Sequence, residues 1–155
     1  MELFSTVAIG LHILAVIVWV GGMFFAYMCL RPAAGPLEPA QRLELWGRGL
    51  EKFFPWVWAS IVALLLSGYG MIFVVFGGFG SVGLHVNIMQ VTGLLMILLY
   101  LHLWFAPYRR FRQALAVGDM AEAGRRLNQI RLIIAINLPL GLLTALIGAT
   151  GRHWG

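Results

Sequence analysis

The stretch from Leu84 to Ala106 constrains the fold of this chain most strongly, because it is mainly apolar and contains no Asp, Glu, Lys or Arg. An α-helix rises about 1.5 Å per residue, so about 20 apolar residues cross a hydrocarbon core of about 30 Å. Hydrophobic residues make up 61% of the sequence and charged residues only 11%. Soluble domains average roughly 45–50% apolar and 25% charged residues. The sequence therefore predicts an integral membrane protein, with residues 1–155 forming a single transmembrane domain.

Three further apolar segments accompany this stretch, and each is longer than a typical buried helix of a soluble protein. The four predicted spans are about residues 3–30, 53–76, 84–106 and 132–149. The fold class expected is therefore all-α, a bundle of four transmembrane helices in contact with the lipid bilayer.

The basic residues predict how these spans are oriented. The link 31–52 holds four Lys or Arg residues and the link 107–131 holds six, which together are ten of the eleven in the chain. The positive-inside rule then predicts that both links lie in the cytoplasm and both termini outside, in a bacterial-type inner membrane. The net charge of +5 thus reflects topology and not a nucleic-acid partner.

Both links are expected to contain helical structure. In the first link, apolar residues recur at helical spacing and predict a short amphipathic cytoplasmic helix at the membrane surface. These residues are Leu43, Trp46, Leu50 and Phe53. A solvated loop is the alternative. In the second link, the chain is expected to break near Gly118, and Asp119 followed by Glu122 is typical of a capped helix start. The last helix is therefore predicted to begin at Met120, before the apolar span.

Several polar side chains lie inside the predicted spans, where unsatisfied polar groups are costly. His12 is expected about 13 Å below the outer surface, while His85 is at the outer edge of its span. The polar residues that can meet in the outer leaflet are His12, Ser67, Tyr69, His85, Gln90 and Thr144. His102 lies about 25 Å from His85 along the same helix, and Asn137 is the polar residue nearest to it in depth.

Imidazole is a common axial ligand of haem iron and a good ligand for copper. We therefore predict a cofactor site formed by His12, His85, His102, Gln90 and Asn137, with His12 and His85 as the metal ligands. Haem b is the leading cofactor and copper the alternative. A third reading is that the histidines only pack between helices. No catalytic residue is identified.

Three local sequences stand out beside the apolar composition. In the first span, His12 is followed by Trp19-Val20-Gly21-Gly22-Met23-Phe24-Phe25 and Leu30-Arg31-Pro32. The others are Leu101 to Arg110, with the sequence LHLWFAPYRR, and Leu127-Asn128-Gln129-Ile130-Arg131. These sequences resemble the CopD-type copper-resistance membrane proteins. The resemblance covers nearly the whole chain and implies a membrane protein linked to copper or haem.

The wider group of this resemblance includes the HemJ-type protoporphyrinogen oxidases, which carry a lysine two residues after the histidine that starts the third span. This sequence has Asn87 at that position. The leading function is haem-based membrane electron transfer, and the alternatives are copper transport or a non-catalytic accessory subunit. A quinone or a redox protein is the expected partner for electron transfer, and a homo-oligomer is compatible with each function.

Overall fold

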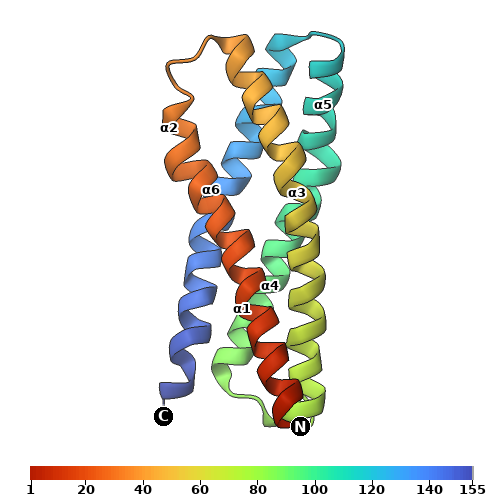
Figure 1. Cartoon of the computed structure of the whole chain (residues 1–155), viewed down its shortest axis with the longest axis vertical. Helices are drawn as coiled ribbons and strands as arrows, with labels where there is room; N and C mark the ends of the chain where they lie inside the picture. Colours follow the sequence, from red (N-terminus) through yellow and green to blue (C-terminus); the bar gives the residue numbers. More distant parts are fainter. Residues whose placement is uncertain (155) are drawn as a thin grey trace.

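The computed structural model describes residues 1–154 as an antiparallel bundle of four long helical rods (Figure 1). The first rod comprises α1 (Glu2–Phe24), the π-helical stretch η1 (Phe25–Leu30) and α2 (Arg31–Ala33). The second rod comprises α3 (Pro39–Gly70) and the π-helical stretch η2 (Met71–Val75). The third rod comprises α4 (Leu84–Leu103), the π-helical stretch η4 (Trp104–Tyr108) and α5 (Arg109–Ala116). The fourth rod comprises α6 (Met120–Thr150) and the 3₁₀ turn η5 (Gly151–His153). Within residues 1–154 there is no strand, and the loop between the second and third rods holds one short 3₁₀ turn, η3 (Phe79–Ser81).

Each rod is long enough and apolar enough to cross a membrane, which confirms the predicted fold class. The rods contain 32, 37, 33 and 34 residues, more than the predicted spans, because the helices continue beyond their apolar sections into the basic links.

Glycines with positive φ angles stand at two chain reversals, and the predicted break near Gly118 is confirmed. Gly77 and Gly78 adopt φ angles of +74° and +123° between the second and third rods, a conformation that favours glycine. Gly118 has a φ of +73° and ends the third rod. Immediately afterwards, a carboxylate oxygen of Asp119 accepts a hydrogen bond of 3.0 Å from the backbone N–H of Glu122. The last helix therefore begins at Met120, as predicted.

The predicted amphipathic cytoplasmic helix is not a separate element on the membrane surface. Its residues belong to α3, which runs without interruption into the second span and through Pro55. The side chains of Leu43, Trp46 and Leu50 are buried in the bundle core. The apolar periodicity was helical, but the apolar face packs against α5 and α6, because the neighbouring rods also continue beyond their spans.

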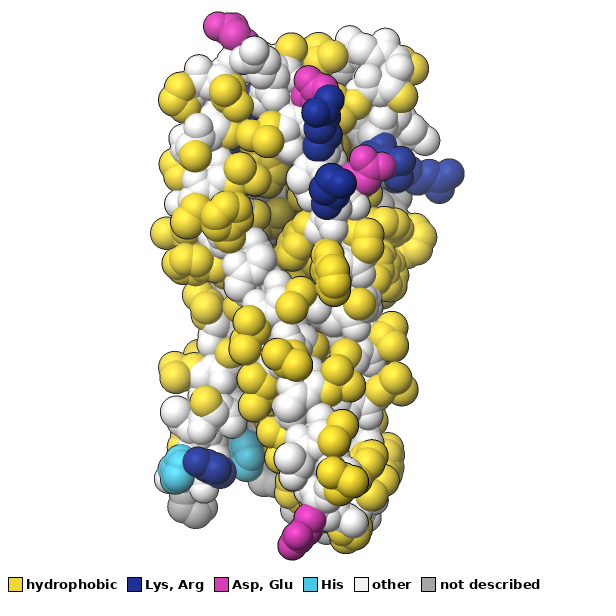
Figure 2. All heavy atoms as spheres, viewed as in Figure 1, with side chains coloured by type: hydrophobic (Ala, Val, Ile, Leu, Met, Phe, Trp, Pro, Cys, Tyr) yellow, Lys and Arg dark blue, Asp and Glu magenta, His cyan; other side chains and the backbone are white. Residues whose placement is uncertain are grey.

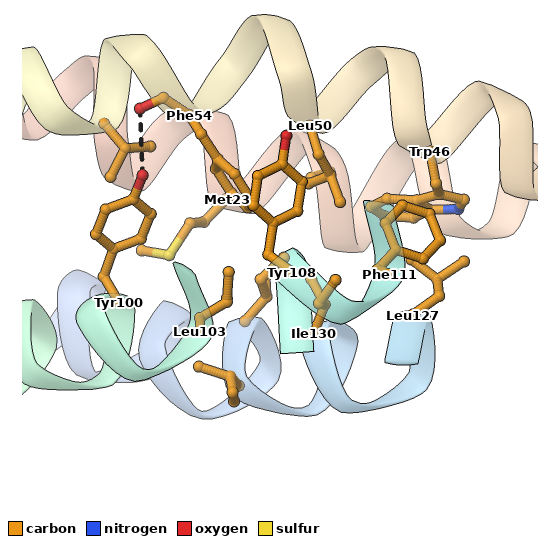
Figure 3. Packing of buried hydrophobic residues seen from close by; sticks show 14 of the residues in the cluster. Met23, Trp46, Leu50, Phe54, Tyr100, Leu103, Tyr108, Phe111, Leu127 and Ile130 are labelled. Carbon is orange, nitrogen blue, oxygen red and sulfur yellow. Dashed lines mark hydrogen bonds between the residues drawn. The ribbon is translucent and has the colours of Figure 1, made fainter. Parts of the chain in front are cut away.

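Large side chains fill the core between the rods, as Figure 3 shows for buried residues of α1, α3, α4, η4, α5 and α6. The ring centroids of Phe54 and Tyr108 are 4.6 Å apart at an interplanar angle of 83°. The Tyr100 hydroxyl donates a hydrogen bond of 3.2 Å to the carbonyl oxygen of Phe54 (Figure 3). Because Trp46 and Phe111 are also fully buried, the core extends almost to the beginning of α3.

Charged side chains gather at one end of the bundle. On the face drawn in Figure 2, most Lys and Arg side chains lie toward the upper end, while hydrophobic side chains cover the middle. We call this the basic end; it contains the first turns of α3, all of α5 and the first turns of α6. The opposite end contains the start of α1, the loop with η3, the start of α4 and η5.

Candidate functional site

His12 lies on α1 and faces α3, where its Nδ1 is 2.8 Å from the hydroxyl oxygen of Ser67. The same hydroxyl oxygen is 2.5 Å from the carbonyl oxygen of Ala63, one turn earlier on α3. Ser67 is buried and His12 is half-buried between the two helices. The structure thus connects the deepest predicted histidine to one of the polar residues expected at its depth.

These contacts determine which ring nitrogen of His12 carries the proton. A serine hydroxyl has a single proton, and a carbonyl oxygen can only accept, so the Ser67 proton lies on the bond to Ala63. The Ser67 oxygen must then accept from Nδ1–H of His12. For the neutral ring, the network therefore assigns the Nδ1–H tautomer. Its Nε2 keeps a lone pair and has no hydrogen-bond partner among residues 1–154.

A glycine lets the His12 ring lie directly on α3. A Cβ atom at Gly68 would be 3.3 Å from Cε1 of His12, which is tighter than ordinary van der Waals contact. About two turns nearer the start of α1, a Cβ atom at Gly70 would be 3.2 Å from the Phe4 ring. The close approach of α1 and α3 therefore depends on residues without side chains, as is common between membrane helices.

Two further polar pairs lie near the His12 layer. Gln90 on α4 donates a long hydrogen bond of 3.4 Å to the hydroxyl of Tyr69 on α3, two residues beyond Ser67. The hydroxyl oxygens of Thr144 on α6 and Thr92 on α4 are hydrogen-bonded to each other at 2.8 Å. The predicted outer-leaflet residues are thus joined in pairs and do not form one cluster. Thr92 was missed, because a single threonine in an apolar span gives no distinct sequence signal.

His85 lies apart from this layer, at the start of α4. A side chain at Gly151 on η5 would overlap the Cβ of His85, and the rings of His85 and Trp154 have centroids 6.5 Å apart. His85 precedes Gln90 by five residues, and Gln90 is level with Tyr69. Counting along the helices places His85 about 10 Å nearer than His12 to the end of the bundle that lies opposite the basic end. The two predicted metal ligands therefore contact different helices at different depths.

His102 and Asn137 are not brought together either. Asn137 is only 3% exposed, and its Nδ2 donates a hydrogen bond of 3.2 Å to the carbonyl oxygen of Met96. Met96 precedes His102 by six residues, which is about 9 Å along α4. His102 is exposed on the surface of the bundle. The expectation that Asn137 and His102 share a depth is therefore wrong, because residue counting does not give the offset of α6 along α4.

Asn137 instead borders a small cavity in the bundle core. The cavity has a volume of about 10 Å³ and is lined mainly by apolar side chains, among them Trp19, Met23 and Tyr100. The Oδ1 of Asn137 is buried and has no hydrogen-bond partner within residues 1–154. This volume is about that of one water molecule by the same measure. Of the residues predicted for a cofactor site, Asn137 is thus the one enclosed in the core.

The described residues contain no group of three or more His, Cys, Asp or Glu side chains that could hold a metal ion. The feature with clear ligand chemistry is a single imidazole, His12, whose Nδ1–H is hydrogen-bonded and whose Nε2 lone pair is available. Ligating histidines commonly have this arrangement, in which a hydrogen bond from the other ring nitrogen orients the ring.

Comparison with known proteins supplies the family. The family model described as CopD, copper resistance protein D, matches residues 47–150, from within α3 to the last residue of α6. The match includes Ser67 and His85 but not His12. Neither the curated proteins nor the solved structures give a match. Because the matched region is more than half of the chain, this multi-pass membrane protein belongs to the copper resistance protein D family.

Proposed function

We propose that this protein transports copper ions across the membrane and that Nε2 of His12 binds the ion within the bundle. The observation that carries the proposal is the hydrogen-bond chain from His12 to Ser67 to Ala63. This chain leaves Nε2 with a free lone pair that can coordinate a metal ion. Neutral imidazole is a good copper ligand, and the family to which the chain belongs is associated with copper resistance.

Ser67 has a defined part in this function. By accepting the Nδ1–H of His12, it holds the imidazole against α3 and keeps the proton away from Nε2. Loss of such a partner typically weakens metal binding by about 10- to 100-fold. Ser67 is therefore a positioning residue, whereas His12 contacts the ion. His85, at the opposite end from the basic links, is the proposed first contact for copper arriving from outside.

Membrane electron transfer through haem b is the second candidate, because the same free Nε2 could serve as an axial ligand. Ligation of one haem by both His12 and His85 does not fit the arrangement, since the two side chains differ in depth by about 10 Å. In this candidate His12 is the sole histidine ligand, and a quinone or a redox protein exchanges electrons with the site.

We further propose that the protein lies in a bacterial-type inner membrane with its basic end in the cytoplasm and both termini outside. The support is the concentration of ten of the eleven basic residues in the two links at that end. Copper would then enter at the side of His85 and leave at the side of α5.

The test compares purified wild-type protein with three variants, after loading with Cu(I) under reducing conditions. We expect His12→Ala to lose bound copper and Ser67→Ala to bind it about 10- to 100-fold more weakly, measured by competition with a chelator. Ser60→Ala is the matched control, because Ser60 is also buried on α3 but makes no hydrogen bond to a histidine.

Full copper retention by His12→Ala would contradict the proposed ligand. The same samples distinguish the second candidate by their absorption spectrum. A Soret band in the wild-type protein that disappears in His12→Ala would establish haem binding in place of copper transport.

A further inference from the structure

A groove that the copper proposal does not use lies near the basic end, between the third rod and α6. Its volume is about 290 Å³. The polar side chains that line it are His102, Arg110, Arg126 and Gln129, and its apolar lining includes Pro107 and Leu132. The groove opens on the outer surface of the bundle, where His102 is exposed and Leu132 is 62% exposed.

The helical repeat brings these residues to one place. His102 and Arg110 are eight residues apart, slightly more than two turns, and therefore lie on the same face of the third rod. Arg126 and Gln129 are three residues apart on α6, and Nη1 of Arg126 donates a hydrogen bond of 3.0 Å to the Gln129 side chain. The two rods thus present cationic groups to the groove from both sides.

The positive charge of the groove is only partly neutralised. The Glu122 carboxylate accepts hydrogen bonds from both Arg125 and Arg126, so one negative charge is shared by two arginines. Arg110 makes no hydrogen bond or ion pair to any residue in the range 1–154. Nη2 of Arg126 is also free of hydrogen bonds in this part of the chain. The groove therefore offers unpaired guanidinium donors beside an apolar wall.

We propose that this groove binds one anionic phospholipid, with the headgroup phosphate between Arg110 and Arg126 and the acyl chains along Pro107 and Leu132. Charge complementarity supports this occupant, because guanidinium groups form strong, two-pronged hydrogen bonds with phosphate. The arrangement along the bundle supports it as well: the cations lie at the end of the apolar spans, and an exposed leucine continues toward the membrane interior. Basic pockets between membrane helices are known to bind anionic headgroups in this way.

Native mass spectrometry of the purified full chain in detergent tests the proposal. The protein is offered phosphatidylglycerol or phosphatidylcholine with identical acyl chains, and the fraction of protein with one bound lipid is measured. We expect preferential binding of phosphatidylglycerol, weakened about tenfold by Arg110→Gln, because a charge-assisted hydrogen bond contributes on this scale. Arg126→Gln should have a similar effect, and Arg110→Lys should restore part of the binding by restoring the charge.

Arg109→Gln is the matched control, because it removes the same charge one position away, at a residue that does not line the groove. It should change lipid binding by less than about twofold if a direct contact decides affinity. Equal loss in the Arg109 and Arg110 variants, or no preference of the wild-type protein for phosphatidylglycerol, would overturn the proposal. Displacement of the lipid by soluble glycerol phosphate would also overturn it, since the acyl chains would then contribute nothing.

Discussion

The position of the Ser67 hydroxyl proton decides which ring nitrogen of His12 keeps a free lone pair. If the Ser67 hydroxyl donated to His12, its oxygen and the Ala63 carbonyl oxygen would face each other at 2.5 Å without a hydrogen between them. The intrahelical bond of Ser67 therefore sets the tautomer of a histidine on another helix. This coupling gives a serine in an apolar span a direct influence on ligand chemistry, without any contact to the ligand.

At the basic end, Glu122 makes stability depend on pH. Hydrogen bonds from Arg126 and Arg125 lower the pKa of Glu122 below its ordinary value. A carboxylate whose folded-state pKa is lowered stabilises the protein above its unfolded-state pKa, and this contribution is lost as the pH falls through the folded-state value. We expect Glu122→Gln to lower the melting temperature at neutral pH, and the difference from wild type to disappear in acid.

Thermal unfolding in detergent between pH 3 and pH 7, followed by circular dichroism, measures this difference. Glu44→Gln is the control, because the Glu44–Arg48 ion pair has side chains that are 61% and 75% exposed and should contribute little. A pH-independent difference between wild type and Glu122→Gln would show that the ion pairs of Glu122 are not its source.

The candidate site could be predicted from the sequence only in part. The depth of His12 follows from counting residues, because the rise of a helix is fixed. Its choice of Ser67 in place of Gln90 or Thr144 depends on the rotation and tilt of each helix, which counting does not provide. The position of His102 beside Arg110 and Arg126 was missed for the same reason.

Among the elements, α3 shows how a correct periodicity can suggest a wrong environment. The spacing of Leu43, Trp46 and Leu50 defines an apolar face, but the pattern is the same whether that face meets lipid or other helices. The beginning of α6 was more predictable, because the contact between Asp119 and Glu122 lies within four consecutive residues. Features specified by local chemistry could thus be read from the sequence, whereas features specified by neighbouring rods could not.

The packing of α6 against α1 and α4 depends on Gly141. A Cβ atom there would be 2.9 Å from Cε of Met96 and 3.0 Å from Cγ2 of Val20. Val20 is buried and stiff about its first side-chain torsion, so it cannot move aside easily. We expect Gly141→Ala to destabilise the bundle by about 1–3 kcal/mol, as overpacking of a filled core does. Thermal unfolding in detergent is the measurement.

Gly124, on the same helix, provides the comparison. Nothing lies within 4 Å of a Cβ atom at that position, so Gly124→Ala adds helix propensity without a clash. It should be neutral or stabilising by up to about 1 kcal/mol. If both alanine variants gave the same melting temperature, close approach at Gly141 would not limit the packing of the bundle.

For the whole molecule, the basic end is expected to face the cytoplasm. Two exposed loop positions test this orientation: Val117, which is 80% exposed beside α5, and Ser81 in the loop at the opposite end. Cysteine is introduced at each position in a chain whose exposed native thiol is removed by Cys29→Ala. An impermeant maleimide should label Ser81→Cys in intact cells, and Val117→Cys only after the membrane is permeabilised. Labelling in the reverse order would mean that the bundle is inserted the other way round.

The length of the rods means that one molecule is stabilised in two different solvents. The second rod has 37 residues and is therefore about 55 Å long, whereas the hydrocarbon core is about 30 Å thick. Around Trp46 and Phe111, beyond the apolar sections, we expect water to surround the bundle and the hydrophobic effect to hold the rods together. Around Gly68 and Gly141, where we expect lipid chains to surround the helices, close packing and hydrogen bonds must do so. Dissolved ions and denaturants therefore act on one end of a continuous helix, while the thickness and composition of the bilayer act on the other.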